Sequence, residues 1–372
     1  MPTGSTATTW QRAPGVMPGA ERKSTTFDGQ CCRLGLSSAS RMRFGTVVLV
    51  GRTNVGKSTF LNAALGVNLA ITSRLPQTTR DALLGVLTTD DAQIAFVDTP
   101  GLHPPRNELG RRMNAAALHA ARDADVLVFM TDRLAQGATP TDAHEPSAPP
   151  RLDPQDVGLL EQVLSNRPSL AIINKVDRFR RKSELLPTID ALARLHPFCA
   201  IVPTSLLDPK DVQRVLSAIV GLLPEGPRGY DADALTDRPT TFFVREFVRE
   251  QVLRGAEREV PHAVAVSVDC IETSRAALTA RATLHVEKPG QRRILVGRGG
   301  AVIREIGHGA RERLHELLGC RVHLELFVRV TPRWKQLSRQ LAELGYDPPG
   351  PADPSGLELA PGAPRTRKRR RR

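Results

Sequence analysis

Short apolar runs alternate with helical periodicities through the first two thirds of the chain. Continuous apolar runs of about four to eight residues predict buried strands, and apolar residues at helical spacing predict helices. Strands are expected at 46–50, 83–89, 93–98, 126–130, 170–174 and 200–204, and helices at 59–65, 111–122, 157–164 and 185–195. Residues 90–92 join the second and third strands as a hairpin turn. The pattern predicts a mixed, mostly parallel sheet with helices on both faces.

The pattern changes after 221–238, a polar stretch with Pro and Asp that predicts a linker. Beyond it we expect an amphipathic helix at 242–252, strands at 263–270 and 281–287, a helix over 303–317, a strand at 322–330 and a last helix from Trp334 to Leu344. With 372 residues the chain can form two domains, each with its own core. The expected division is a disordered extension (1–41), a first domain (42–222), a linker (223–239), a second domain (240–346) and a disordered basic tail (347–372).

Charge is distributed unevenly along the chain, whose net charge is +13. The first domain is neutral, whereas 240–346 carries +6 and the final stretch 365–372 carries +7. This surplus favours a polyanionic partner for the C-terminal part, either RNA or an anionic membrane surface. No apolar run approaches the roughly 20 residues of a membrane span. The five cysteines are scattered, which is typical of a reducing compartment without a structural metal.

A phosphate-binding loop is predicted where the first strand meets the first helix. The sequence Gly51-Arg52-Thr53-Asn54-Val55-Gly56-Lys57-Ser58 follows an apolar run and precedes a helical segment. Gly51 and Gly56 allow backbone N–H groups to point at a phosphate chain, Lys57 can reach the β- and γ-phosphates, and the Ser58 hydroxyl can bind Mg²⁺. The motif in this context predicts nucleoside triphosphate binding.

Two further segments complete the phosphate end of the predicted site. Asp98-Thr99-Pro100-Gly101-Leu102 follows an apolar strand, where Asp98 can hold Mg²⁺ through water and the Gly101 N–H can contact the γ-phosphate. In the loop 66–80, a threonine can close over the γ-phosphate and bind Mg²⁺. Thr78 and Thr79 are both candidates, and we favour Thr79.

Base selection is assigned to Asn174-Lys175-Val176-Asp177, after the strand 170–174. The Asp177 carboxylate can accept hydrogen bonds from N1–H and the exocyclic amine of guanine, a pair of donors that adenine does not present. Loss of both bonds with adenine would cost several kcal/mol, so the sequence favours guanine.

A glycine turn in the second domain predicts an RNA clamp. Gly297-Arg298-Gly299-Gly300 is a G-x-x-G turn, which lets a nucleic-acid backbone approach closely. The turn alone is a weak signal. Its flanks add arginines for phosphates (Arg292, Arg293, Arg298 and Arg304) and apolar residues for bases (Ile294, Leu295, Val296, Val302 and Ile303).

These motifs together resemble the translation-factor-like small GTPases, and specifically the Era family of ribosome-assembly GTPases. The resemblance extends from about Phe44 to Tyr346. It implies an α/β P-loop GTPase domain followed by an α+β K-homology (KH) domain of type II. It also implies binding of GTP, GDP and Mg²⁺, hydrolysis of GTP, and binding of the 3′ end of 16S rRNA during rRNA processing and small (30S) subunit biogenesis.

The chain departs from the family pattern in a few places. Thr53 stands where the family usually has proline, and Ser205 matches a base-contacting motif that is otherwise altered here. Residues 137–154 have the character of an insertion. Leu102 occupies the place of the water-orienting glutamine of Ras-like enzymes, so slow intrinsic hydrolysis is expected. Asn54 resembles a P-loop asparagine that binds K⁺ in related GTPases, which would supply positive charge beside the phosphates.

The resulting interpretation is a monomeric GTPase of the bacterial cytoplasm, with peripheral contact to the inner membrane as an additional expectation and the mitochondrial matrix as a weaker alternative. One alternative function is another K⁺-dependent GTPase, such as a tRNA-modifying one. A second is an RNA-binding or membrane-associated scaffold whose nucleotide site is idle. His103, His262 and His308 are interpreted as structural.

Overall fold

The computed structural model describes residues 42–105, 107–132, 152–163, 167–179, 182–255, 260–274 and 276–346. The predicted extension 1–41, the tail 347–372 and most of the predicted insertion 137–154 lie outside the described residues. No helix among the described residues is long and apolar enough to cross a bilayer.

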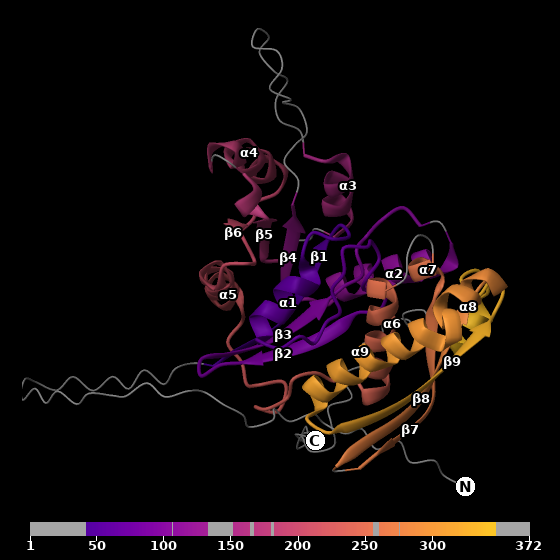
Figure 1. Cartoon of the computed structure of the whole chain (residues 1–372). Coiled ribbons are helices and arrows are strands. Elements are labelled where there is room, and N and C mark those ends of the chain that lie inside the picture. The colour runs from indigo at the N-terminus through magenta and orange to yellow at the C-terminus, as the bar shows by residue number, and fades with distance from the viewer. Residues whose placement is uncertain are drawn as a thin grey trace, which may run out of the picture.

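The first domain is built on a six-stranded sheet with the order β2-β3-β1-β4-β5-β6 (Figure 1). All neighbouring strands are parallel except β2 and β3, which form the expected antiparallel hairpin at one edge. The strands are β1 (Arg43–Gly51), β2 (Leu83–Thr88), β3 (Ala92–Asp98), β4 (Val126–Thr131), β5 (Ser169–Asn174) and β6 (Ala200–Thr204). Because β1, β3 and β5 run in parallel, the residues that end them meet at the same edge of the sheet.

Helices cover both faces of this sheet, as predicted. Side chains of α1 (Lys57–Leu65) and α5 (Pro209–Leu222) share a buried cluster with one face. Side chains of α2 (Glu108–Arg122), α3 (Pro154–Val163) and α4 (Leu186–Leu195) pack with the other. Two short 3₁₀ turns, η1 (Val176–Arg178) and η2 (Lys182–Leu185), follow β5. Helix α5 was not anticipated from the sequence, although Asp208 accepts a bond from the Lys210 N–H at its start, as an N-cap does.

The predicted linker 223–239 packs along the open edge of this sheet. The Val86 N–H donates to the Leu235 carbonyl at 2.8 Å, and the Thr236 hydroxyl donates to the Leu84 carbonyl at 2.7 Å. The Gln93 side chain accepts from two further N–H groups of the segment. The linker therefore covers backbone groups of β2 that an edge strand would leave unpaired.

The longer elements of the second domain follow the order α6-β7-β8-α8-α9-β9, with α6 and α9 on one face of a three-stranded sheet (Figure 1). Strand β7 is antiparallel to β8, and β9 is parallel to β8. The elements are α6 (Thr240–Gly255), α7 (Val260–Ala263), β7 (Ala265–Thr273), β8 (Ala277–Val286), α8 (Pro289–Val296), η3 (Arg298–Gly300), α9 (Ala301–Leu318), β9 (Arg321–Val330) and α10 (Ser338–Glu343). The prediction that the last helix includes Trp334 was wrong. Trp334 lies in a turn before α10, fully buried, where its indole N–H donates to the Ala263 carbonyl at 3.0 Å.

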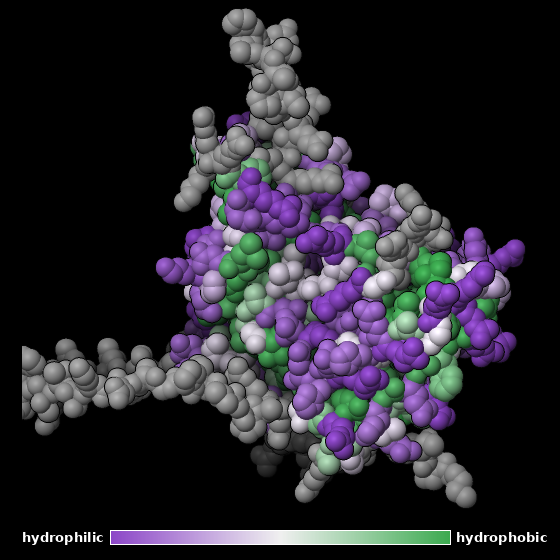
Figure 2. Space-filling view, viewed as in Figure 1, coloured by the Kyte–Doolittle hydropathy of each residue, from purple (hydrophilic) through white to green (hydrophobic). Residues whose placement is uncertain are grey.

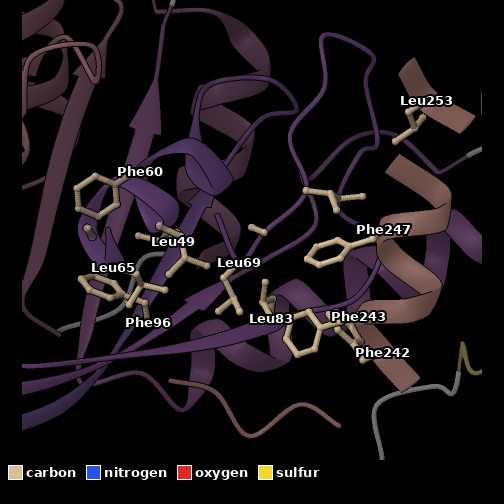
Figure 3. Close-up of a cluster of buried hydrophobic side chains, with 14 of the residues drawn as sticks. Leu49, Phe60, Leu65, Leu69, Leu83, Phe96, Phe242, Phe243, Phe247 and Leu253 are labelled. Atoms are coloured by element: carbon tan, nitrogen blue, oxygen red, sulfur yellow. The ribbon is translucent and has the colours of Figure 1, made fainter. Parts of the chain in front are cut away.

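Two predictions about the cores were wrong for one reason. Helix α6 was expected to be amphipathic, yet ten of its residues are buried on all sides of the helix. It lies between the two domains, and Phe243 and Phe247 project toward Leu69 and Leu83 of the first domain (Figure 3). One buried apolar cluster thus runs through both domains, where we had expected two separate cores.

Candidate functional site

The phosphate loop depends on close backbone approaches that only glycine permits. Gly51 has φ +150°, and a Cβ there would lie 2.3 Å from the Met130 carbonyl oxygen of β4. Gly56 has φ +112°, and a Cβ there would lie 2.3 Å from the side-chain nitrogen of Asn174. Helix α1 begins at the next residue, Lys57, so its free N–H groups face the concave side of the loop.

Lys57 is a buried cation at the centre of this loop. Its side chain is 5% exposed, and its ammonium group donates to the Gly51 carbonyl at 3.0 Å and the Arg52 carbonyl at 2.8 Å. Burial lowers the pKa of Lys57 to about 8, although the charge of Asp98 acts in the opposite direction. A polyanion in the loop would favour the charged form.

Three oxygen-bearing side chains converge beside Lys57. The Ser58 hydroxyl donates to Asp98 Oδ2 at 2.6 Å and lies 3.0 Å from the Thr79 hydroxyl, which is itself 3.4 Å from Asp98 Oδ2. The other Asp98 oxygen is buried without a hydrogen-bond partner, and burial raises the pKa of this carboxyl group. Such a site suits Mg²⁺, because Mg²⁺ prefers oxygen ligands and would neutralise a desolvated carboxylate. Thr78 points elsewhere, since its hydroxyl donates to the Leu75 carbonyl at 2.7 Å.

The segment after β3 lies directly on the phosphate loop. The Thr99 hydroxyl donates to the Leu49 carbonyl at 2.6 Å and fixes the segment to β1. Gly101 approaches Thr53 so closely that a Cβ would lie 2.7 Å from its backbone nitrogen. The Leu102 side chain that follows is 4% exposed and packs in the core, away from solvent.

His103 joins two of the predicted nucleotide-sensing segments. Its Nε2 lies 2.8 Å from the Gln77 side chain, and its Nδ1 lies 3.0 Å from the Gly101 carbonyl oxygen. We had interpreted His103 as structural because no partner stands near it in the sequence. Gly101 is two residues away, but Gln77 lies 26 residues earlier in the chain, a partner that only the fold could reveal.

A cavity of about 90 Å³ lies between the phosphate loop and the loop that carries Thr79. Besides predicted residues, it is lined by Thr59, Ile71, Thr72, Ser73 and Gln77, which the sequence analysis did not assign to the site. Thr59 lies in the first turn of α1, directly after the predicted loop, and the other four lie in the polar loop 66–80.

The base-binding motif is linked to the phosphate loop by hydrogen bonds. The Asn174 side chain donates to the Val55 carbonyl at 2.7 Å, and the Lys175 ammonium donates to the Asn54 carbonyl at 2.7 Å. Lys175 also pairs with Asp132 at 2.5 Å. Val176 begins the 3₁₀ turn η1 that presents the next residue of the motif.

Asp177 and Ser205 follow two neighbouring strands, β5 and β6, and meet through a hydrogen bond. The Ser205 hydroxyl donates to Asp177 Oδ1 at 2.7 Å, while the Ser205 N–H donates to Asp211 at 2.7 Å. Ser205 therefore orients the carboxylate assigned to guanine recognition.

Pro100 completes the set of predicted nucleotide contacts. It is buried between Thr99 and Gly101.

Arg52 was predicted within the nucleotide-binding loop, but its side chain turns away from the loop. It is 6% exposed and pairs with Asp156 at 2.7 Å, Asp153 at 3.2 Å and Asp132 at 3.6 Å. Only the backbone of Arg52 is thus available to a phosphate. The ion pairs attach the phosphate loop to α3, a role that the sequence did not indicate.

The G-x-x-G turn connects α8 with α9. Gly297, Gly299 and Gly300 all have φ between 59° and 77°, and a Cβ on Gly299 would meet no atom within 4 Å. The turn thus leaves open space beside its backbone. Arg292, Arg293, Arg298 and Arg304 are all exposed around it.

Apolar groups also reach the surface near this turn, where Figure 2 shows hydrophobic and hydrophilic residues side by side over α8. Ile294 is 50% exposed, and Val296, Val302 and Ile303 are half-buried. Leu295 was predicted to line the same groove. That prediction was wrong, because Leu295 is fully buried and packs in the core.

Comparison with known proteins decides the family. Residues 46–175 match a family model described as 50S ribosome-binding GTPase, and residues 259–335 match a model described as KH domain. The GTPase Era of Lactobacillus delbrueckii subsp. bulgaricus is 39% identical over 313 residues, which cover 84% of this chain and 99% of that protein. This chain belongs to the Era family of GTPases. The GTPase Era of Geotalea uraniireducens is 37% identical over 310 residues, covering 82% of this chain and 99% of that protein.

Solved Era structures share the fold over both domains. Era of Aquifex aeolicus bound to GDP·AlF₄⁻ has a TM-score of 0.74 at 33% identity, covering 82% of this chain and 99% of that one. An Era in complex with MgGDPNP and nucleotides 1506–1542 of 16S ribosomal RNA matches with the same score, identity and coverage. The predicted fold class, a P-loop GTPase domain followed by a KH domain, is therefore confirmed.

Proposed function

We propose that this Era-family chain is a GTP-hydrolysing switch that couples its nucleotide state to RNA binding by the KH domain. Its nucleotides are GTP and GDP with Mg²⁺, its RNA is the 3′ end of 16S rRNA, and its role is in rRNA processing and small-subunit biogenesis. The observation that carries the proposal is the convergence of Lys57, Asp98, Thr79 and Asp177 at one sheet edge in a chain that also has the KH turn.

The phosphate end would work mainly by electrostatics. In this arrangement Lys57 and the N–H groups of residues 51–58 bind the triphosphate, and Gly101 contributes its N–H at the γ-phosphate. Ser58, Thr79 and Asp98 would hold Mg²⁺, which neutralises charge that develops on the phosphate oxygens. The apolar Leu102 cannot polarise water, so hydrolysis by the free protein should be slow.

A monovalent cation is part of the proposal. Asn54 has φ +64°, is exposed, and donates from its side chain to the Arg74 carbonyl at 2.8 Å. Its place beside the phosphate loop supports a K⁺ site, in which the ion supplies charge that an arginine supplies in other GTPases.

The choice of RNA rests on the Era complex with a 16S rRNA fragment, which matches this chain over both domains. The glycine turn would bind the backbone of a single-stranded segment, with the exposed arginines on phosphates and Ile294 beside the bases. The charge surplus of residues 240–346 supports the same partner.

Turnover by the purified full chain tests the enzyme assignment against an idle-site scaffold. Wild type should hydrolyse GTP in Mg²⁺ buffer, and Lys57→Ala should lose at least about a hundredfold in rate, as expected when a buried charge that contacts the transferred phosphoryl group is removed. Equal rates for the two proteins would reject the enzyme assignment.

RNA binding is tested at Gly299 with a matched control. Gly299→Asp places a carboxylate on the open side of the turn, where it should repel phosphates and lower affinity for a 3′-terminal 16S oligonucleotide by about tenfold or more. Gly319→Asp is the control, since Gly319 ends α9 with φ 65° and likewise has no atom within 4 Å of a Cβ. Equal affinities for the two variants would reject the turn as the RNA site. Crosslinking to rRNA with GTP or GDP bound would map the contacts.

We further propose a monomer in the bacterial cytoplasm, with the arginine-rich stretch 365–372 adding contact to anionic membranes. Sedimentation of the purified chain tests the oligomeric state. Binding to phosphatidylserine vesicles, compared with a chain that ends at residue 346, tests the membrane contact, and equal binding of the two chains would reject it.

A further inference from the structure

The loop that carries Thr79 is held by the KH domain on both sides of this threonine. On one side, the Thr78 carbonyl accepts a hydrogen bond from the Arg249 guanidinium of α6. Arg249 is fully buried and pairs with Glu246 one turn earlier at 2.5 Å. Burial alone would raise the pKa of Glu246, but the charge and hydrogen bonds of Arg249, with the charge of Arg245, outweigh it and lower that pKa.

On the other side, Arg80 reaches into a cage of the KH domain. Its guanidinium donates to the Val264 carbonyl at 2.7 Å and to the Tyr346 hydroxyl at 3.2 Å. It lies over the rings of Trp334 and Tyr346, with 5.6 and 6.0 Å to the ring centroids. The Arg80 side chain is 5% exposed, and both aromatic residues are buried.

Two neighbouring contacts strengthen the same connection. Asp81 pairs with Arg245 of α6 at 2.5 Å. Arg112 of α2, which follows the segment of Gly101, donates to the carbonyl oxygens of Tyr346 and Ser338. The KH domain thus contacts the loop of Thr79 through α6, and its C-terminal part contacts α2, the helix that follows the segment of Gly101.

Burial gives these contacts more weight than surface ion pairs have. An exposed salt bridge contributes about 0–1 kcal/mol, because water replaces the lost partner. Water cannot readily replace the partners of Arg249 or Arg80, so a movement of the loop must either break these bonds or carry the KH groups along. Thr79 stands beside Ser58 and Asp98 while all these contacts are made.

We infer that Arg249 and the Arg80 cage are positioning elements by which the KH domain holds Thr79 at the Mg²⁺ site, and through which RNA and GTP affect one another. The inference rests on the proposed function and extends it to named residues. Neither arginine reaches the predicted nucleotide site with its own side chain, so both act through the loop backbone.

The coupling has a defined direction. Thr79 is expected to contact Mg²⁺ only when the γ-phosphate is present. Loss of the KH contacts should therefore weaken binding of GTP with Mg²⁺ and leave GDP binding unchanged. Because coupling between two ligands is reciprocal, the factor by which RNA changes GTP affinity equals the factor by which GTP changes RNA affinity. Both factors should fall toward one when the connection is cut.

The test uses the full chain and two independent variants. Glu246→Gln/Arg249→Met removes both buried charges together, which avoids leaving Glu246 without its closest partner, and Arg80→Met keeps an apolar chain in the cage. The control is Arg313→Met, since Arg313 also crosses between domains but donates at 2.8 Å to Asn68, at the far start of the loop 66–80 and ten residues before Thr78. Glu250, the acidic partner of Arg313, retains Arg254 in this control.

Three quantities are measured for each protein: the ratio of GTP-analogue to GDP affinity, the Mg²⁺ concentration that gives half-maximal turnover, and the affinity for the 16S oligonucleotide with each nucleotide. In both test variants the ratio of GTP-analogue to GDP affinity should fall about tenfold, which lies within the usual range of allosteric coupling. The Mg²⁺ concentration for half-maximal turnover should rise. Their GDP affinity, their RNA affinity with GDP, and all values for Arg313→Met should remain near wild type.

The outcomes separate the inference from the function on which it rests. If wild type binds GTP and RNA but both test variants keep its ratio and its Mg²⁺ requirement, the inference is wrong and the proposed function stands. An equal fall of the affinity ratio in Arg313→Met would also overturn the inference, because a general weakening of the contact between the domains would then explain the effect. Failure of wild type to bind GTP would reject the proposed function itself.

Discussion

Raising the pH above about 8 should weaken GTP binding through Lys57. This lysine is 5% exposed, and burial lowers its pKa to about 8 from the ordinary 10.5. Phosphate oxygens in contact with the ammonium favour its charged form, so the pKa in the complex should return toward the ordinary value. The site must then take up a proton when nucleotide binds at alkaline pH.

The size of the effect follows from the two pKa values. Below pH 8 the free lysine already carries its proton, so affinity should not depend on this group. Above pH 8, GTP affinity should fall by up to about tenfold for each pH unit, until the pH reaches the pKa that Lys57 has in the complex. The interval between about 8 and 10.5 limits the total loss to roughly 3 kcal/mol, or two to three powers of ten.

Calorimetric titration with GTP provides the assay. Affinities at about pH 7, 8 and 9, each measured in two buffers of different ionisation enthalpy, report both the loss and the proton uptake. The guanine base of GTP also loses a proton at alkaline pH, and this affects binding to both wild type and Lys57→Met. The difference between the pH profiles of the two proteins therefore reports the effect of Lys57 alone. A wild-type affinity that follows the variant's pH profile in parallel, with no extra proton uptake, would refute the reasoning.

Four further predictions concern the site and the core. Thr79→Ala should raise the Mg²⁺ concentration that turnover requires, whereas Thr78→Ala should change it little, because the Thr78 hydroxyl donates to a backbone carbonyl. A larger effect of Thr78→Ala would show that the wrong threonine was assigned. Asp177→Asn should lose GTP affinity by at least about a hundredfold, because the amide keeps one acceptor, loses the charge and turns an NH₂ group toward a guanine donor. It should gain affinity for xanthosine triphosphate, whose ring offers an acceptor to the new amide. K⁺ should raise turnover over Na⁺ in wild type but not in Asn54→Ala, and equal rates in both salts would count against the cation site. Trp334→Ala should lower the free energy of unfolding by about 3–5 kcal/mol in urea titrations, because the indole is fully buried.

The nucleotide site could be predicted from sequence because each of its parts is contiguous. Gly51 to Ser58 lie at the junction of one strand and one helix, so their chemistry depends on local backbone geometry. The strands behind them are buried on both faces and therefore appear as continuous apolar runs. A parallel sheet then brings the ends of β1, β3 and β5 together without further information.

Residues whose partners come from distant parts of the chain could not be predicted in the same way. Arg52 is one of the variable positions of its motif, and nothing near it indicates that Asp156, about a hundred residues later, would bind its side chain. His103 likewise contacts Gln77, which lies 26 residues earlier and reaches it only in the folded chain. Leu295 has the same apolar character as Ile294, and only the rotation of α8 decides which of them is exposed.

Helix α6 explains why the largest error and the further inference concern the same place. A charged residue among apolar ones, such as Glu246 or Arg249, suggests a solvent-facing side when one domain is considered alone. Here that side meets the first domain, where Glu246 and Arg249 pair with each other and Arg249 also donates to the Thr78 carbonyl. Because a buried ion pair is weak evidence for stability, these charges are better explained by a connection that must be specific and breakable. An apolar α6 could join the two domains as firmly, but it would offer the loop of Thr79 no hydrogen bond to gain or lose.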